Sequence, residues 1–406
     1  MKHHLITVLV SLCLSVSCWG QLPFGNTPPL HVEGKQLRDD EGNKIVLHGV
    51  MDTPNPYFNS WRWGKSTDDN RIGDCLAYFD MLYTAITDTA QGAFANVVRL
   101  HLDPCWTNDP NLKSDGKERG EADISRFSDK RLEKYLRLLF YPLAHDAIAH
   151  GLYVVMRPPG VCPRKIQAGG YYQQYLMTVW DVVSRNDSVR KYSGQVSLEL
   201  ANEPVIVLDS TGQETPAALK QLFQPVVDKI RSNGFTGIIW VPGSGWQSNY
   251  RGYAANPISG DNIGYAVHDY PGWYGTSDST ADAENGIRRF HEAVPVVDTN
   301  PIIITEVDWS PQKPGCGHYN EHGIWVPSNY GTWATASTSK WGKAFKRLLD
   351  HYGNISMTLS GTACYIDIDT LLNSGRVIPA FPGIDEACGE ACFKWYREYA
   401  HHITRR

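Results

Sequence analysis

The sequence predicts an α/β protein with one (β/α)8 TIM barrel behind an N-terminal β-hairpin, and three observations predict it. Short β-branched runs alternate with longer amphipathic segments along the chain. The short runs are almost continuously apolar, as in parallel strands that are covered on both faces. No Gly-rich phosphate loop follows any of them, which disfavours the alternative of a doubly wound sheet.

The hairpin comes first, because Leu30–Arg38 and Lys44–Val50 flank the turn-forming sequence Asp39-Asp40-Glu41-Gly42-Asn43. The barrel strands are predicted at Ile45–Val50, Asn96–Leu102, Leu152–Met156, Val196–Leu200, Gly237–Val241, Ile263–His268, Ile302–Thr305 and Ile355–Leu359. The helices are predicted at Ile72–Thr89, Ser128–His150, Tyr171–Arg185, Ala217–Ser232, Ala281–Ala293, Ser337–Tyr352 and Asp385–Ala400. Strands that alternate with helices in this way form a parallel sheet.

Length and composition indicate the number of domains and disfavour some classes of protein. The chain has 406 residues without repeats, charge runs or linkers, so residues 21–406 are predicted to form a single catalytic domain of barrel size. A net charge of −5 disfavours a nucleic-acid partner. The 46 aromatic residues disfavour a disordered chain. The 13 Trp indicate either core packing or a sugar-binding cleft, because flat indole faces match the apolar faces of pyranoses.

Residues 1–20 are predicted to be a signal peptide. Leu5–Val16 is an apolar run that is too short to span a bilayer, and no other segment is long and apolar enough to do so. Cleavage after Gly20 would give a secreted or periplasmic protein. Cleavage before Cys18 would instead give a lipid-anchored cell-surface lipoprotein, although Ser15 stands where a lipobox has Leu.

Two glutamates stand at the ends of predicted barrel strands. Glu203 follows Val196–Leu200 in the sequence Asn202-Glu203-Pro204, and Glu306 follows Ile302–Thr305. The carboxyl ends of barrel strands line the mouth where active sites are built. A retaining glycosidase needs two carboxyl groups about 5–5.5 Å apart across the scissile bond. We therefore predict this pair as the catalytic residues, with a buried ion pair as the alternative.

The chain resembles glycoside hydrolase family 5, the cellulase and mannanase family, over about residues 30–400. The two glutamate motifs carry the resemblance, together with Gly34-Lys35-Gln36-Leu37, His48-Gly49-Val50, Val97-Val98-Arg99-Leu100 and Tyr265-Ala266-Val267-His268-Asp269-Tyr270. The resemblance implies double displacement by two glutamates, with no cofactor and no metal. Cys316, His318 and His322 have ligand-like spacing, but one loop without a fourth ligand does not predict a zinc site.

Roles for the site residues follow from the chemistry and from this resemblance. Glu203 is predicted to be the general acid/base and Glu306 the nucleophile. Arg99 would hold the nucleophile ionised through charge-assisted hydrogen bonds, and Tyr270 would donate its hydroxyl to the same carboxylate. Asn202 would bind the sugar 2-hydroxyl. Further predicted substrate-binding residues are His268, which would also support the acid/base, His101, Arg157, Trp106, Trp273 and Trp309.

Two segments depart from the family pattern. The family has a His at the end of the third strand, where this sequence has Pro158, and Arg157 is the candidate to occupy that position, on substrate or on a carboxylate. The family has a Trp at the end of the eighth strand, where Ser360-Gly361-Thr362-Ala363-Cys364-Tyr365 contains none. Tyr365 and the loop residue Trp309 are candidate substitutes.

The predicted function is a secreted retaining endo-β-glycanase that hydrolyses β-1,4-linked polysaccharide. β-1,4-Glucan, as cellulose or mixed-linkage glucan, is preferred because Tyr265–Gly275 is similar to cellulases. An endo-β-1,4-mannanase is the first alternative, since Leu198–Pro204 is similar to the mannanase branch, and a xylanase the second. A non-catalytic carbohydrate-binding barrel is the alternative of another class, although such a protein needs neither glutamate.

Overall fold

The computed structural model describes residues 27–276, 282–309, 312–319, 324–329, 340–384 and 387–402. The predicted signal peptide, with Cys18, and His322 lie outside these ranges. The segment with Cys316 and His318 is described as backbone only, so the predicted absence of a metal there stays a prediction.

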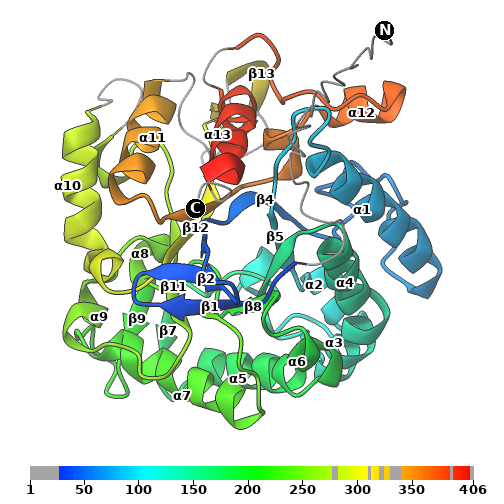
Figure 1. Ribbon diagram of the computed structural model, residues 1–406. Helices are drawn as coiled ribbons and strands as arrows, with labels where there is room; N and C mark the ends of the chain where they lie inside the picture. The colour runs from blue at the N-terminus through cyan, green and yellow to red at the C-terminus, as the bar shows by residue number, and fades with distance from the viewer. Residues whose placement is uncertain are drawn as a thin grey trace, which may run out of the picture.

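A closed barrel of eight parallel strands forms the centre of the molecule, with helices around it (Figure 1). The strands follow one another around the barrel in chain order, and each lies on a segment that the sequence predicts as a strand. They are β4 (His48–Asp52), β5 (Val97–His101), β6 (Tyr153–Arg157), β8 (Val196–Glu199), β10 (Ile239–Pro242), β11 (Ile263–His268), β12 (Ile302–Val307) and β15 (Ser356–Leu359). The predicted fold class is confirmed.

The predicted helices are present with small changes at their ends. The long ones are α1 (Ile72–Ile86), α5 (Tyr171–Ser184), α7 (Ala218–Ser232), α10 (Ala283–Ala293), α11 (Lys340–Tyr352) and α13 (Cys388–His402). The predicted helix 128–150 is instead α3 (Asp129–Tyr135), a π-helical turn (Leu136–Phe140) and α4 (Tyr141–Ala149). Pro142 explains the interruption, because it offers no N–H to the preceding turn. Short helices are α2 (Pro104–Thr107), α6 (Asp187–Lys191), α8 (Ser244–Gln247), α9 (Arg251–Ala255) and α12 (Ile368–Ser374).

The N-terminal segment forms three antiparallel strands, not the predicted simple hairpin. β1 (Leu30–Glu33) and β2 (Gln36–Asp39) are separated by a turn at Gly34, whose φ of +59° suits glycine. β3 (Lys44–Ile45) pairs with β2 and is separate from β4, so the predicted strand Ile45–Val50 is divided. Figure 1 shows β1 and β2 across the end of the barrel.

This small sheet closes the amino-terminal end of the barrel. Its apolar side chains Leu30, Leu37 and Ile45 share one hydrophobic cluster with barrel residues such as Val97 and Trp240. Active sites of (β/α)8 barrels lie at the opposite, carboxyl-terminal mouth.

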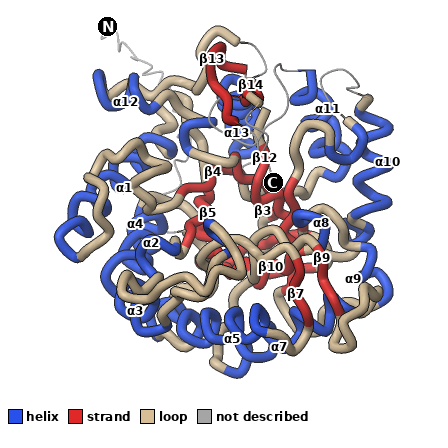
Figure 2. Tube along the Cα trace, turned by 180° about the vertical axis from the view of Figure 1, so that it is seen from behind, coloured by secondary structure: helices blue, strands red, loops and turns tan. Residues whose placement is uncertain are grey.

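Short strands lie in the loops of that mouth. Figure 2, turned by 180° from Figure 1, shows this side of the molecule. β7 (Lys165–Gln167) pairs with β9 (Ile206–Leu208), and β13 (Gln312–Tyr319) pairs with β14 (Trp325–Asn329). The second pair lies in the long segment after β12 that the sequence predicts as a loop. Among the described helices, none is long and apolar enough to cross a membrane.

Candidate active site

Glu203 and Glu306 lie together at the barrel mouth, although 102 residues separate them in the chain. His268, at the end of β11, stands between them, with Nδ1 3.2 Å from Glu203 Oε1 and 3.6 Å from Glu306 Oε2. One oxygen of each carboxylate and a ring nitrogen of His268 lie within 4.8 Å of one another. The Glu203 side chain is 26 % exposed and that of Glu306 7 %, so Glu203 is the more open to solvent.

Arg99 organises the floor of this site from β5, where it is fully buried. Its Nη1 donates to Glu306 Oε1 at 2.6 Å, and its Nε and Nη2 donate to Glu199 Oε2 and Oε1 at 2.5 and 3.0 Å. Its Nη2 also donates to Asn202 Oδ1 at 2.7 Å. A guanidinium with two carboxylate partners satisfies the condition for burying a charge. The predicted contact between Arg99 and Glu306 is present in the structure.

Glu306 is held as an anion. Burial alone would raise its pKa, but the charges of His268 and Arg99 outweigh burial and lower the pKa to about 2. Tyr270 donates its hydroxyl to Glu306 Oε2 at 3.0 Å and lies 3.1 Å from Ser360 Oγ. Burial, and next the charge of Glu306, raise the pKa of Tyr270 well above its usual range, so it remains a donor.

Asn202 points its amide nitrogen away from the floor. Its Oδ1 accepts from Arg99, so Nδ2 is the atom left for a further partner. The side chain is 2 % exposed beside Glu203, which is where the prediction requires a donor for a sugar hydroxyl.

The backbone at Glu203 is strained, with φ of +57°, a region that residues other than glycine seldom occupy. Gln247 supports this conformation. Its Oε1 accepts from the Glu203 N–H at 2.9 Å, while its Nε2 donates to Glu199 Oε1 at 2.7 Å and to Thr305 Oγ1 at 3.3 Å. Gln247 is fully buried and, like Trp246 before it, has a positive φ.

Sequence reasoning missed Glu199 and Gln247. Glu199 had a usable signal, because a glutamate inside an otherwise apolar barrel strand needs a buried partner. Gln247 had none, since it ends the short helix α8 and its partners are far away in sequence.

His101 and Arg157 form a pair where β5 and β6 end side by side. A guanidinium can only donate, so Arg157 Nη2 donates to His101 Nδ1 at 2.7 Å and Nε2 carries the ring hydrogen. Burial, and next the charge of Arg157, lower the pKa of His101 well below its usual range. Arg157 is 3 % exposed and lies 3.6 Å from Glu121 Oε2, so it is a buried charge facing a carboxylate and not a rim charge.

Two predicted substrate-binding tryptophans belong to the core. Trp309 is fully buried, with its ring 5.3 Å from Trp395 and 5.5 Å from Trp341. Trp106 is fully buried, and its Nε1 donates to Pro54 O at 2.6 Å. Neither ring offers a face to a sugar in this structure, contrary to the expectation. A position in the sequence places a residue on a loop but does not tell which way its side chain packs.

Tyr365, the other candidate for the missing tryptophan, is also buried, and its hydroxyl accepts from the Phe94 N–H at 2.9 Å. Trp273 remains a candidate, because it is half-buried with its ring 5.4 Å from that of Tyr270. Well-exposed aromatic side chains on the mouth loops include Trp246 after β10 and, on the loop after β4, Tyr57, Phe58 and Trp61.

Two groups of described residues bring three possible metal ligands together. Glu203, His268 and Glu306 form one, but the Arg99 guanidinium on Glu306 opposes a cation there. The other is an exposed ion-pair cluster around His150, whose Nε2 lies 3.0 Å from Asp80.

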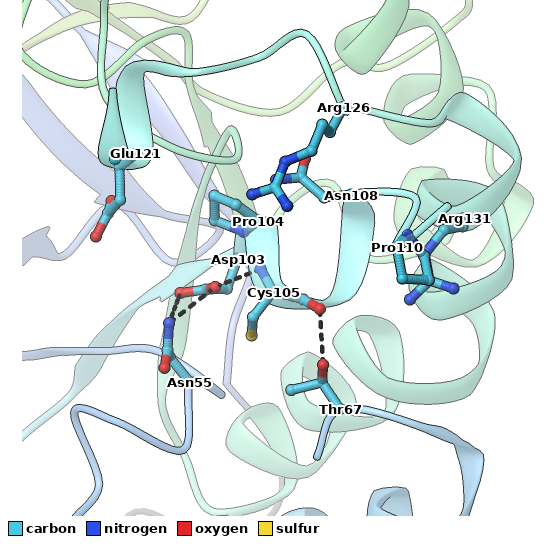
Figure 3. A pocket seen from close by; sticks show the side chains of 11 residues that line it. Asn55, Thr67, Asp103, Pro104, Cys105, Asn108, Pro110, Glu121, Arg126 and Arg131 are labelled. Atoms are coloured by element: carbon cyan, nitrogen blue, oxygen red, sulfur yellow. Dashed lines mark hydrogen bonds between the residues drawn. The ribbon is translucent and has the colours of Figure 1, made fainter. Parts of the chain in front are cut away.

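A pocket of about 330 Å³ opens next to the His101–Arg157 pair. Figure 3 shows Glu121 and the Asp103–Asn55 contact at one side of it and Arg126 and Arg131 at the other. Among the predicted site residues none lines this pocket, although Asp103 lies only two residues beyond His101.

Comparison with known proteins agrees with this geometry. A family model described as Cellulase (glycosyl hydrolase family 5) matches residues 84–341. An endoglucanase of Bacillus sp. (strain KSM-635) is 25% identical over 210 residues, which are 46% of this chain and 21% of that protein. The chain thus spans about a fifth of the length of this curated relative.

Solved structures show the same fold. The β-glucanase SdGluc5_26A of Saccharophagus degradans, solved with cellotetraose, superposes with a TM-score of 0.58 at 15% identity, covering 93% of this chain and 94% of that one. The catalytic domain of Thermobifida fusca endoglucanase Cel5A superposes with a TM-score of 0.53 at 18% identity, covering 92% and 98%.

Proposed function

The chain belongs to glycosyl hydrolase family 5, the cellulase family, and from this premise we propose that it is a secreted retaining endo-β-1,4-glucanase. The observation that carries the proposal is the closeness of the Glu203 and Glu306 carboxylates, whose oxygens lie within 4.8 Å. Retaining glycosidases have carboxyl groups about 5–5.5 Å apart, whereas inverting ones need about 6.5–9.5 Å to admit a water molecule.

In the first step, Glu306 attacks the anomeric carbon while Glu203 donates its proton to the glycosidic oxygen. The C–O bond to the leaving sugar breaks, and a covalent glycosyl-enzyme forms on Glu306. The division of roles follows from the contacts. The charges of His268 and Arg99 keep Glu306 ionised, while Glu203 has no ion-pair partner besides His268 among the described residues.

In the second step, Glu203 takes a proton from water, and the water oxygen attacks the anomeric carbon as the bond to Glu306 breaks. Two inversions give net retention. The Asn202 amide nitrogen donates to the sugar 2-hydroxyl, a contact that strengthens in the transition state. Trp246 is the proposed support for the leaving sugar, since its side chain is 49 % exposed and its N–H donates to the carbonyl of Pro204, next to Glu203.

Glucan is the proposed substrate, since the matching family model is described as cellulase and the curated relative is named an endoglucanase. The endo mode is supported by exposed aromatic residues on two separate mouth loops, Trp246 after β10 and Trp61 after β4, which suit an extended chain. β-Mannan and xylan remain the alternatives, and a non-catalytic barrel is the outcome if none is cleaved.

Export is proposed from the apolar run Leu5–Val16, with a lipid anchor at Cys18 as the alternative. Fatty-acid labelling of the whole chain, with Cys18→Ala as the control, separates the two. Label that disappears in the variant supports the anchor, and absence of label supports free secretion.

The decisive experiment is a product profile. Residues 21–406 are incubated with barley β-glucan, carboxymethyl-cellulose, glucomannan, galactomannan and xylan, with Glu306→Ala protein as the inactive control. We expect oligosaccharides from the glucans and, by proton NMR, β-anomers first. Release from mannans alone would move the substrate to β-mannan. Net inversion would refute the double displacement, and binding without release would indicate the non-catalytic barrel.

A further inference from the structure

The pocket of about 330 Å³ lies among the loops that follow β4 and β5, at the same end of the barrel as the catalytic pair, and contacts lead from its wall towards that pair. Glu121, on its wall, lies 3.6 Å from Arg157, and Arg157 donates to His101 at 2.7 Å. His101 stands two residues beyond Arg99 on β5, on the same face, and Arg99 holds Glu306. The pocket and the catalytic pair are also linked electrostatically, because burial and then the charges of Asp103 and Glu306 raise the pKa of Glu121 in spite of Arg157.

The wall with Glu121 is firmly built. The Val161 N–H donates to Glu121 O at 3.2 Å, and Gly160 packs so closely that a Cβ there would come within 2.2 Å of the same oxygen. Only glycine suits this contact, since Gly160 also has φ of +74°. The pocket is thus preformed where the loops after β5 and β6 meet.

The acidic side chains that line the pocket, Asp103 and Glu121, lie on one side of it. Asp103 accepts from the Thr53 hydroxyl at 2.6 Å, from Asn55 Nδ2 at 3.1 Å and from the Cys105 N–H at 2.9 Å. Glu121 faces Arg157 with a side chain that is 35 % exposed. Their remaining acceptor capacity suits sugar hydroxyls.

The opposite side carries two arginines. Arg131 is anchored by its Nε, which donates to Trp106 O at 3.1 Å, and its guanidinium lies over the Tyr135 ring. Arg126 has no side-chain hydrogen bond and no ion pair to any described residue, and its Nε is buried without a partner. Its charge helps to lower the pKa of Asp123, after hydrogen bonds from Ser125 and Ser114. A guanidinium without a hydrogen bond to any described residue, at the edge of a preformed pocket, can bind an anion.

We propose that this pocket binds an anionic sugar branch of the polysaccharide held at Glu203 and Glu306, with Arg126 as the group that recognises the anion. The branch hydroxyls would meet Glu121 and Asp103, and its carboxylate or sulfate would meet Arg126 and Arg131. A planar carboxylate, as in a uronosyl residue, matches the guanidinium in two parallel hydrogen bonds. The size also fits, since small-molecule pockets begin at about 300 Å³. The inference rests on the proposed function for the identity of the main chain only.

Binding is tested first, on the full chain carrying Glu306→Ala, so that turnover plays no part. Methyl β-D-glucuronoside, methyl β-D-glucoside and glucose 6-sulfate are titrated by NMR. We expect the glucuronoside to bind about tenfold more tightly than the glucoside, as loss of a charge-assisted bond predicts. Added Arg126→Met should abolish that difference, while Arg376→Met, an exposed arginine next to α12, should preserve it.

Arg126→Met removes no side-chain hydrogen bond and no ion pair to a described residue, so the fold should persist, and Arg126→Lys gives a second, charge-conserving variant. A preference for the sulfate that depends on Arg126 would assign the anion to a sulfate ester. Equal binding of the neutral and the anionic sugars, or a preference unchanged in Arg126→Met, would overturn the proposal.

Turnover then separates this inference from the proposed function. With otherwise wild-type enzyme, Arg126→Met should leave hydrolysis of unbranched β-glucan unchanged and lower kcat/KM on a uronosyl-branched glycan about tenfold. Failure on every β-glycan with intact glucuronoside binding would refute the proposed function and leave the pocket standing. Equal losses on branched and unbranched chains would refute the pocket as a branch site.

Discussion

At the scale of single residues, the two glutamates differ because their surroundings differ. Glu306 lies on β12 between Arg99 and Tyr270, and its pKa is lowered to about 2 although burial acts in the opposite direction. Glu203 lies beyond the end of β8, more exposed and next to His268. One environment favours a permanent anion, and the other suits a group that both gives and takes a proton.

The nucleophile assignment predicts the behaviour of Glu306→Ala. Activity on glucan should fall about 10⁴-fold or more, because no covalent intermediate can form. Azide fills the space of the lost carboxylate, so it should restore turnover and give a glycosyl azide of inverted configuration. Product NMR checks this, with Glu292→Ala, an exposed glutamate on α10, as the control. Absence of rescue would count against the assignment.

The acid/base assignment predicts a dependence on the leaving group. Glu203→Ala should lose about 10²–10⁴-fold on polysaccharide, whose leaving alcohol needs a proton. On 2,4-dinitrophenyl β-cellobioside the first step should be nearly unchanged, because that leaving group departs as an anion. Burst kinetics on both substrates measure it. An equal loss on both would exclude this role.

At the scale of elements, the loop through α8 holds the segment that follows β8. The N–H groups of Gly245 and Trp246 donate to Val205 O and Pro204 O, both at 2.9 Å. Gln247 Oε1 accepts a hydrogen bond from the Glu203 N–H. Three successive positive φ values in this loop and one at Glu203 would cost about 1–3 kcal/mol for each non-glycine residue without such support.

Gln247→Leu therefore tests whether the loop positions the acid/base. It leaves the Glu203 N–H and Glu199 with unmet hydrogen bonds in the core. We expect kcat on glucan to fall about 10–100-fold with little change in KM, because a misplaced acid/base weakens the transition state alone. Gln224→Leu is the matched control, since Gln224 also bridges two segments but on the surface of α7. A change in KM alone would contradict a positioning role.

At the scale of the whole molecule, the two ends of the barrel differ in what they contain. The N-terminal sheet covers one end of the barrel, and the cluster of Glu203, His268 and Glu306 lies at the other. His48 belongs to the covered end, where β4 begins. Its Nδ1 lies 2.8 Å from Val46 O, and burial lowers its pKa to about 4 in spite of hydrogen bonds to the backbone that act to raise it.

This histidine makes folding depend on pH. Protonation favours the unfolded state, whose His pKa is about 6.5, so the stability is complete above pH 6.5 and is lost as the pH falls towards 4. By pH 4.5 the loss is about 2.5 kcal/mol. His48→Gln should therefore lose about 2.5 kcal/mol less than the native chain between pH 7 and pH 4.5, as measured by urea unfolding.

The comparison of two proteins at two pH values cancels the other titrating groups. Asp52 is one of these, because burial raises its pKa to about 6, and its effect on stability has the opposite sign. His31→Gln, on the exposed side of β1, should leave the difference between the two pH values unchanged. A pH dependence as steep in His48→Gln as in the native chain would refute the assignment.

Sequence patterns alone determined the barrel, the order of its strands and the pair Glu203 and Glu306. A strand can be recognised from local sequence, because it needs only a short apolar run between turns. A charged residue directly after such a run is expected at the carboxyl-terminal mouth of the barrel. The single domain 21–406 and the signal peptide remain predictions. The hydrophobic pattern did not predict that the N-terminal hairpin and the helix 128–150 are each divided. In each case a single residue, Gly34 or Pro142, causes the division.

Only the tertiary structure showed several further contacts around the site. Gln247 reaches Glu203 across 44 residues and Glu121 reaches Arg157 across two loops, and no local pattern records such contacts. For the same reason, the sequence did not reveal that Trp309 lies in the core or that Arg126 Nε is buried without a hydrogen bond beside a pocket. The periodicity of a sequence tells on which element a residue lies, whereas its partners depend on distant segments that meet only when the barrel closes.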